Sequence, residues 1–220
     1  MDIIRNNAAN YTVFEFGNRK DWLFARKGHI GASDASAVLG LCPWRTNVQL
    51  WEEKMSDEEP VEIINPNIER GIKSEPHIRE LYSIESRDSV QDGTGIMLVS
   101  NKHPFMSCTL DGACIDKDGK PYILEIKSVN WTRKWSRGYS IPDYYFIQLL
   151  HQMVVTGWDN AILLARIIMP SGDEVVTRKY IVNRGDVKSL MDGLIEKEKE
   201  FAKSIEDGIR PDLIIPIPSI

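Results

Sequence analysis

The sequence has few cysteines and no long apolar run. Its three cysteines, Cys42, Cys108 and Cys114, form no CxxC pair. They are too few for a four-cysteine iron–sulfur cluster and argue against a disulfide framework, so we expect buried free thiols and a reducing compartment. No stretch approaches ~18 consecutive apolar residues, and no basic flank precedes an apolar segment at the amino-terminus. We therefore expect a cytoplasmic protein with no membrane span.

An excess of positive charge is also absent. The chain carries 27 Lys and Arg against 32 Asp and Glu, a formal net charge of -5. This excludes a protein coated in positive potential, but it allows a nucleic-acid enzyme whose basic residues line one groove. The hydrophobic fraction of 42% excludes disorder as the main state. A length of 220 residues predicts a single domain with an ordinary core.

The order of the expected elements indicates the fold class. The first third reads as helical, with Ser33 as an N-cap and a capping box at Thr46 and Gln49. Strand patterns and an Asp-Gly turn follow, then helices alternate with strands. The helices are expected at 21–27, 33–39, 48–54, 67–84, 143–156 and 186–204, and the strands at 96–100, 105–115, 122–128, 161–168 and 175–182.

This order predicts an α/β (α+β) chain with a central mixed β-sheet flanked by helices. We expect one domain over 1–220, with a helical part to about residue 66, a core over 67–182, and a final helix and tail over 183–220. The tail after Pro211 alternates proline with isoleucine. It is expected to pack as an extended arm or to meet a neighbouring subunit.

The sharpest chemical feature joins Asp111 to Glu125 and Lys127. Alternate residues of a strand share a face, so Glu125 and Lys127 point the same way. Asp111 ends the partner strand of the expected hairpin, so two carboxylates and an ammonium converge. Hard oxygen ligands of this kind suit Mg²⁺. A surface salt bridge between the two strands is the simpler alternative, and this pattern alone leaves it open.

Two helices add polar side chains to buried stripes. Glu75 shares a stripe of its helix with apolar or small residues, so its carboxylate needs a partner that a metal would supply. Gln148 and His151 are the polar members of a stripe in the helix over 143–156. Each of the two could instead be a satisfied core residue.

A third signal is the basic and aromatic segment over 131–137. Two tryptophans and three cations in seven residues could follow a phosphodiester backbone and stack on bases, although a solvated loop shows the same composition. The cations are Arg133, Lys134 and Arg137. Trp22 and Arg45 are weaker candidates for DNA contact by the same reasoning.

The ordered set GASD, PW, LDG, EIK and Q-x-x-HQ, spread over roughly residues 20–165, resembles one family. It is similar to the lambda exonuclease and YqaJ-like viral recombinase family of phage alkaline exonucleases, within the restriction-endonuclease-like PD-(D/E)xK nucleases. The last 50 residues add little to the match.

The resemblance implies roles for single residues. Asp111, Glu125 and the Ile126 carbonyl would hold one or two Mg²⁺, which Mn²⁺ could replace. Lys127 would be the catalytic lysine, with Glu75 and Gln148 completing the site. Arg26, Ser33 and Thr109 would bind the 5′-phosphate, although Thr109 and Leu110 depart from the serine and proline expected there. Ser33 as an N-cap would suit an anion site.

The resemblance also implies an activity and partners. We expect a 5′→3′ exonuclease that degrades one strand of linear duplex DNA from its ends, leaving 3′ overhangs for strand annealing. A ring-shaped homotrimer and a single-strand annealing protein are the expected partners, in the host cytoplasm if a phage encodes the chain. An endonuclease of the same fold and an inactive DNA-end-binding module are the alternatives.

Overall fold

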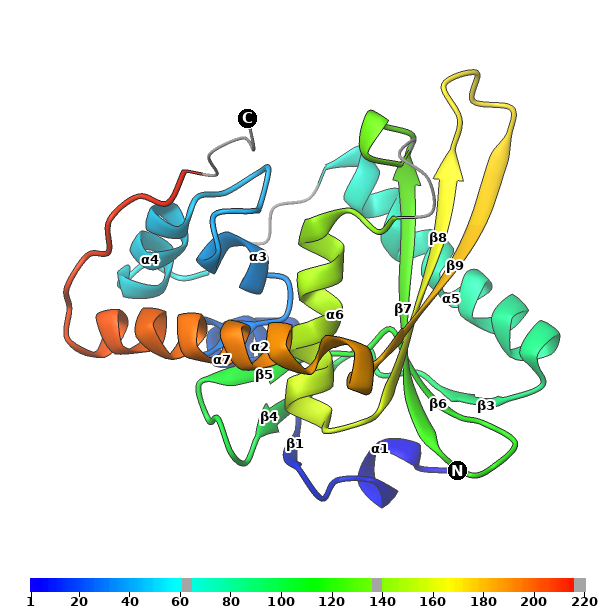
Figure 1. Ribbon diagram of the computed structural model, residues 1–220, viewed down its shortest axis with the longest axis horizontal. Helices are drawn as coiled ribbons and strands as arrows, with labels where there is room; N and C mark the ends of the chain where they lie inside the picture. Colours follow the sequence, from blue (N-terminus) through cyan, green and yellow to red (C-terminus); the bar gives the residue numbers. More distant parts are fainter. Residues whose placement is uncertain (61–64, 136–139, 216–220) are drawn as a thin grey trace.

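Two separate sheets form the framework of the protein (Figure 1). The computed structural model describes residues 1–60, 65–135 and 140–215. The larger sheet has the order β3-β6-β7-β8-β9, in which only β7 and β8 run parallel. Its strands are β3 (Ser89–Gln91), β6 (Gly112–Ile115), β7 (Pro121–Asn130), β8 (Asn160–Ile168) and β9 (Val175–Asn183).

The smaller sheet has the order β1-β4-β5-β2 and is also mixed, because β2 runs parallel to β5. Its strands are β1 (Tyr11–Glu15), β4 (Ile96–Ser100), β5 (Met106–Cys108) and β2 (Ile30–Gly31). The helices are α1 (Ile3–Asn6), α2 (Arg19–Lys27), α3 (Ala35–Val38), α4 (Asn47–Met55), α5 (Pro66–Ser86), α6 (Asp143–Thr156) and α7 (Arg184–Glu206), with a 3-10 turn η1 (Arg133–Trp135).

Helices cover both faces of the larger sheet, and the alternation along β7 explains how. Leu124 and Ile126 pack with Ile78 and Tyr82 of α5. Ile123 points to the other face and joins the main core, to which α6 contributes Leu149, Leu150 and Met153. Both faces of β7 are therefore buried, and α5 and α6 lie on opposite sides of the sheet (Figure 1).

The expected strand over 105–115 is wrong as one element. The structure divides it into β5 and β6, which belong to different sheets, and Asp111 lies in the link between them. Two distant residues hold the link. Arg79 Nη1 donates to the Asp111 carbonyl at 2.9 Å, and Gly93 approaches the Leu110 carbonyl so closely that a Cβ would lie 2.3 Å from that oxygen.

The expectation of a purely helical first third is also wrong. Strand β1 pairs with β4 through all five of its residues, from Tyr11 opposite Ser100 to Glu15 opposite Ile96. Ser33 is not an N-cap, because α3 begins at Ala35 after Asp34. The capping box of α4 at Thr46 and Gln49 is confirmed, with both reciprocal hydrogen bonds present.

The cysteines and the described part of the tail agree with the sequence. Cys108 and Cys114 are buried, Cys42 is half-buried, and all three are free. The tail packs as an extended arm on its own chain: Asn47 Nδ2 donates to the Asp212 carbonyl at 2.8 Å, and its Oδ1 accepts from the Ile214 N–H at 3.0 Å. In the described ranges no helix is both long and apolar enough to cross a membrane.

His151 is a structural residue of the core. It is fully buried, with Nδ1 2.9 Å from Glu198 Oε1 and Nε2 2.9 Å from the Ser107 carbonyl. Burial lowers the pKa of His151, but the Glu198 carboxylate outweighs it and the net pKa is raised. Burial also raises the pKa of Glu198, and His151 offsets this only in part. The pair therefore retains a proton and ties α6 to α7.

Replacement of Glu198 should expose the importance of this pair. Glu198→Ala is expected to lower the free energy of unfolding by about 3 kcal/mol, because it leaves His151 without its buried partner. Glu196→Ala, at an exposed position of the same helix, should change it by less than about 0.5 kcal/mol. Urea unfolding followed by circular dichroism measures both, and equal shifts in the two variants would contradict the structural role.

Candidate active site

The structure brings Asp111, Glu125 and Lys127 together beside β7. Glu125 is only 1% exposed, and its Oε1 accepts from Lys127 Nζ at 2.5 Å. Asp111 Oδ2 accepts from the Ile126 N–H at 2.7 Å, so the link before β6 is attached to the middle of β7. Two carboxylates and one ammonium thus share one partly enclosed place.

Amide side chains from α6 complete the shell around Glu125. Gln148 Nε2 donates to Oε1 at 2.6 Å, and Gln152 Nε2 donates to Oε2 at 2.6 Å. Gln148 was expected here, whereas Gln152 was missed. The signal was present, since Gln152 follows Gln148 by one helical turn and shares its face. Two successive turns of α6 therefore hold the carboxylate in one orientation.

The electrostatics of this cluster favour a bound cation. Burial, followed by repulsion from Glu125, raises the pKa of Asp111 well above its usual range. Burial lowers the pKa of Lys127, but Glu125 and Asp111 outweigh it, so Lys127 stays protonated. One ammonium faces two converging carboxylates, and their repulsion is what a divalent cation would relieve.

Glu75 reaches the edge of the cluster from α5. Its Oε1 accepts from Arg79 Nη2 at 3.2 Å. Burial raises the pKa of Glu75, and the charge of Arg79 offsets this only in part. Arg79 was missed by the sequence reasoning, although it lies one turn beyond Glu75. It pairs with Asp92 as well and holds the Asp111 carbonyl, so it connects α5 to the link that carries the first carboxylate.

The donor set suits Mg²⁺ better than a metal that needs many protein ligands. Across the described ranges no three side chains of His, Cys, Asp or Glu are grouped to hold an ion. Asp111 and Glu125 offer carboxylate oxygens, while Arg79 already engages Glu75. Mg²⁺ retains several waters and takes one or two carboxylates, so these residues fit it.

A second cluster, rich in cations, lies around Asp34. Arg26 Nη2 donates to Ser33 Oγ at 2.7 Å, so the structure joins these two predicted phosphate ligands. Asp34 is 1% exposed and receives Arg45 Nη2 at 2.6 Å and Lys54 Nζ at 2.9 Å. Arg26 Nη2 is 3.4 Å from the same carboxylate. Three cations around one buried acid leave an excess of positive charge.

Thr109 lies beside the cluster of Asp111, Glu125 and Lys127, since its carbonyl accepts from Gln152 Nε2 at 3.3 Å. Arg45 is an anchored residue, because it pairs with Glu53 as well as with Asp34. Trp22 lies beneath the Arg26 guanidinium, whose Cζ is 5.4 Å from the ring centroid. Asp34 was missed as a site residue, although the GASD motif contains it.

Two of the three remaining predicted DNA contacts lie within the described residues. Arg133 and Lys134 lie in η1 and are exposed. Lys134 Nζ is 4.8 Å from the ring centroid of Tyr144, at the start of α6. Arg137 lies outside the described residues. Lys134 thus borders the amino-terminal end of α6.

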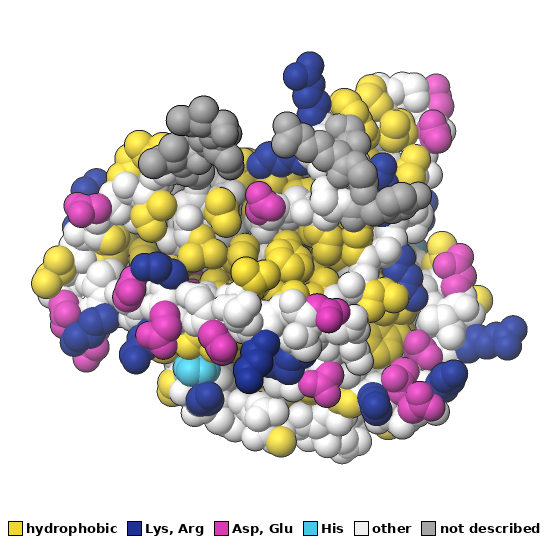
Figure 2. Space-filling model, viewed as in Figure 1, with side chains coloured by type: hydrophobic (Ala, Val, Ile, Leu, Met, Phe, Trp, Pro, Cys, Tyr) yellow, Lys and Arg dark blue, Asp and Glu magenta, His cyan; other side chains and the backbone are white. Residues whose placement is uncertain are grey.

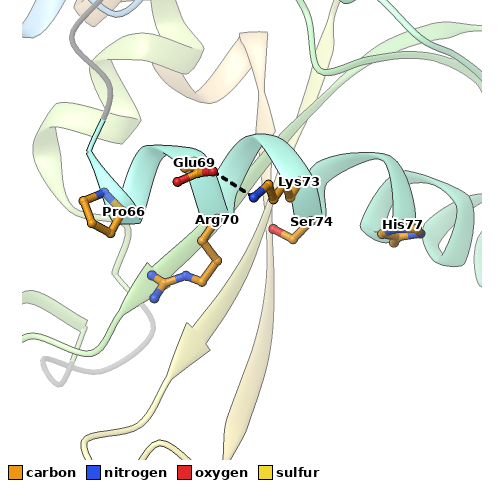
Figure 3. A pocket seen from close by; sticks show the side chains of 6 residues that line it. All are labelled: Pro66, Glu69, Arg70, Lys73, Ser74 and His77. Carbon is orange, nitrogen blue, oxygen red and sulfur yellow. Dashed lines mark hydrogen bonds and ion pairs between the residues drawn. The ribbon is translucent and has the colours of Figure 1, made fainter.

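A cavity of about 450 Å³ opens along α5 (Figure 3). Arg70 Nε and Nη2 are buried there, with no hydrogen-bond partner within the described part of the chain. Lys73 pairs with Glu69 at 2.8 Å. The cavity offers cations, but its one acidic residue is already paired, so it is not a second catalytic site. Its lining consists of Pro66, Glu69, Arg70, Lys73, Ser74 and His77.

Comparison with protein families decides the relationship. The model of the YqaJ-like viral recombinase domain matches residues 21–159. The chain belongs to the YqaJ-like viral recombinase family. The uncharacterized protein YqaJ of Bacillus subtilis (strain 168) is 27% identical over 188 residues, which cover 84% of this chain and 55% of that protein. The YqaJ-like chain thus spans about half the length of this relative.

Solved structures show the same fold. The alkaline exonuclease LHK-Exo from Laribacter hongkongensis matches the YqaJ-like chain with a TM-score of 0.64 and 20% identity, over 86% of this chain and 93% of that one. A phage-related exonuclease from Haemophilus somnus 129PT matches with a TM-score of 0.54 and 11% identity, over 82% and 96%. The predicted restriction-endonuclease-like α/β fold is confirmed, with two mixed sheets in place of one.

Gly93 should be required for the geometry of Asp111. In Gly93→Ala the new Cβ would lie 2.3 Å from the Leu110 carbonyl oxygen, so the link to Asp111 must move. We expect Mg²⁺ affinity, measured by calorimetry, to fall about tenfold, as for loss of a residue that orients a ligand. Gly95→Ala is the poorer control, because Gly95 has a positive φ. Gly185→Ala, with open space around it, should bind Mg²⁺ normally.

Proposed function

We propose that this YqaJ-like protein is a metal-dependent 5′→3′ exonuclease that degrades one strand of linear duplex DNA. The observation that carries the proposal is that Asp111, from the link before β6, converges with Glu125 and Lys127 of β7. The fold it shares with structures titled alkaline exonuclease and phage-related exonuclease supports the same conclusion.

Asp111, Glu125 and the Ile126 carbonyl would hold Mg²⁺, or Mn²⁺ in its place, with Glu75 at the edge of the site. When bound, the metal would stabilise negative charge at the scissile phosphate and would help to ionise the attacking water. Gln148 and Gln152 keep the Glu125 carboxylate oriented. Lys127 stays protonated between the carboxylates, where it positions the attacking water and offsets the negative charge that develops on the phosphate.

The Asp34 cluster would receive the 5′-phosphate of the strand being digested. Arg26 and Ser33 already touch, so a cation and a hydroxyl are oriented together. Thr109 lies next to the carboxylates, because Gln152 donates both to its carbonyl and to the Glu125 carboxylate. A phosphate held at one cluster and a scissile bond at the other would favour stepwise digestion from an end, which an endonuclease has no need for.

The proposed assembly is a homotrimer around the duplex, working with a single-strand annealing protein in the host cytoplasm. Trp22, Arg45, Arg133, Lys134 and Arg137 are the proposed DNA contacts. Light scattering tests the trimer directly, since a 25.1 kDa chain would give a particle about three times heavier.

Metal removal and Lys127 replacement test the chemistry. With Mg²⁺, wild-type protein should release the 5′ label of linear duplex as mononucleotides, leave circles intact, and stop in EDTA. Lys127→Ala should lower kcat by about 10²–10³, the usual loss for one preorganised charge-stabilising group. Lys120→Ala, in the exposed turn before the same strand, should leave kcat unchanged. Cut circles would favour an endonuclease, and no digestion at all would favour an inactive end-binding module.

Arg26 should read the phosphate at the strand end. A charge-assisted hydrogen bond contributes about 1.5–3 kcal/mol, so Arg26→Ala should lower kcat/KM on 5′-phosphorylated ends by roughly 10- to 100-fold. On 5′-hydroxyl ends the variant should behave like the wild type. Arg5→Ala, at an exposed position of α1, is the matched control. Equal loss on both kinds of end would show that Arg26 does not recognise the phosphate.

A further inference from the structure

Trp44 is exposed, whereas the other five tryptophans are buried or half-buried. It lies between α3 and α4, and 70% of its surface is in contact with solvent. Its neighbours keep it in place: Arg45 is bound to Asp34 and Glu53, and Thr46 caps α4. An exposed indole on a fixed backbone is a feature of binding surfaces, because the ring offers apolar area at little entropic cost.

Aromatic contacts orient the Trp44 ring from one side. Its centroid is 4.9 Å from that of Tyr144 at an interplanar angle of 74°, and 6.5 Å from that of Tyr145. The two tyrosines contact each other edge-on at 4.4 Å. We call Trp44, Tyr144 and Tyr145 the aromatic platform. Figure 2 shows apolar side chains gathered over α6 on the face of the molecule that it draws.

The aromatic platform lies next to the cluster of Asp111, Glu125 and Lys127. Lys127 Nζ, which binds Glu125, is 5.1 Å from the ring centroid of Tyr145. Lys134 Nζ is 4.8 Å from that of Tyr144. One tyrosine therefore touches both the catalytic lysine and the exposed indole, and a second cation borders the platform. Flat π-surfaces beside cations are what single nucleic-acid strands bind.

We infer that Trp44 is a base-stacking residue, which holds a nucleobase near the 5′ end of the strand whose phosphate enters the Asp111–Glu125 cluster. This role deepens the proposed function and rests on it. Tyr144 and Tyr145 hold the indole, and Lys134 attracts the adjacent phosphate. A nucleobase fits this surface better than an apolar protein segment, because the platform is flanked by cations and opens beside a site built for phosphate.

A fluorescent base tests the inference without relying on cleavage. A duplex carries 2-aminopurine near one 5′ end and phosphorothioate linkages that resist hydrolysis, and it is titrated with protein in Mg²⁺. Stacking on Trp44 should quench the 2-aminopurine. Trp44→Ala should lose most of the quenching and raise Kd about tenfold, within the range for one stacked base. Trp44→Phe retains a ring and should recover most of both.

The matched control is Phe14→Ala, which removes an exposed aromatic ring from β1 of the smaller sheet. The Phe14→Ala variant should quench 2-aminopurine and bind the duplex as the wild type does. On cleavable duplex, Trp44→Ala should raise KM by more than it lowers kcat, because the chemistry of Lys127 is left in place. A loss of structure alone would not separate KM from kcat in this way or be rescued by phenylalanine.

Other outcomes overturn the inference separately from the proposed function. If Trp44→Ala digests DNA with a normal KM and quenches the base fully, stacking is refuted while the exonuclease stands. If the variant instead changes the particle mass in light scattering and retains quenching, Trp44 belongs to a contact between subunits. If the wild type quenches through Trp44 but never digests DNA, the nuclease function fails and base stacking survives.

Discussion

A buried carboxylate is the constraint around which this protein is arranged. Glu125 lies in the middle of β7 with almost no exposed surface, so each of its oxygens needs a partner. Lys127 comes from the same strand, and Gln148 and Gln152 come from α6. The hydrogen bonds that shape the site therefore also fix how α6 lies on the sheet. The two carboxylate oxygens of Glu125 thus both shape the site and attach α6 to the sheet.

The two charged clusters have opposite electrostatic imbalances. Around Glu125 and Asp111, carboxylates exceed the single lysine, and burial followed by repulsion from Glu125 raises the pKa of Asp111. Around Asp34, three cations surround one acid and hold its pKa well below the usual range against the effect of burial. The first cluster has the charge to suit a cation, and the second has the charge to suit an anion. The net charge of -5 does not reveal these two clusters, because it sums all charges of the chain while each cluster acts over a short distance.

Local patterns predicted much of the site, and non-local contacts account for what was missed. Alternation along β7 placed Glu125 and Lys127 on one side, helical spacing placed Gln148 on a buried stripe, and the family resemblance assigned Gln148 to the site. The break before β6 escaped prediction because residues 105–115 read as one apolar strand, while Arg79 and Gly93 impose the break from a distance. Strand β1 had the aromatic and β-branched residues of a strand, but its pairing with β4 lies far along the chain.

The side-chain amide of Asn47 holds the tail against the helices next to the Asp34 cluster. It donates to one backbone group of the tail and accepts from another, as a peptide unit of a neighbouring strand would. Ala37 of α3, Leu50 of α4 and Phe201 of α7 share one core beneath it. Helices α3 and α4, which directly follow the segments of Ser33 and Arg45, are thereby held between α7 and the tail that follows it. Aspartate has the same shape as asparagine but only acceptors, so it would oppose the Asp212 carbonyl and weaken this hold on one side.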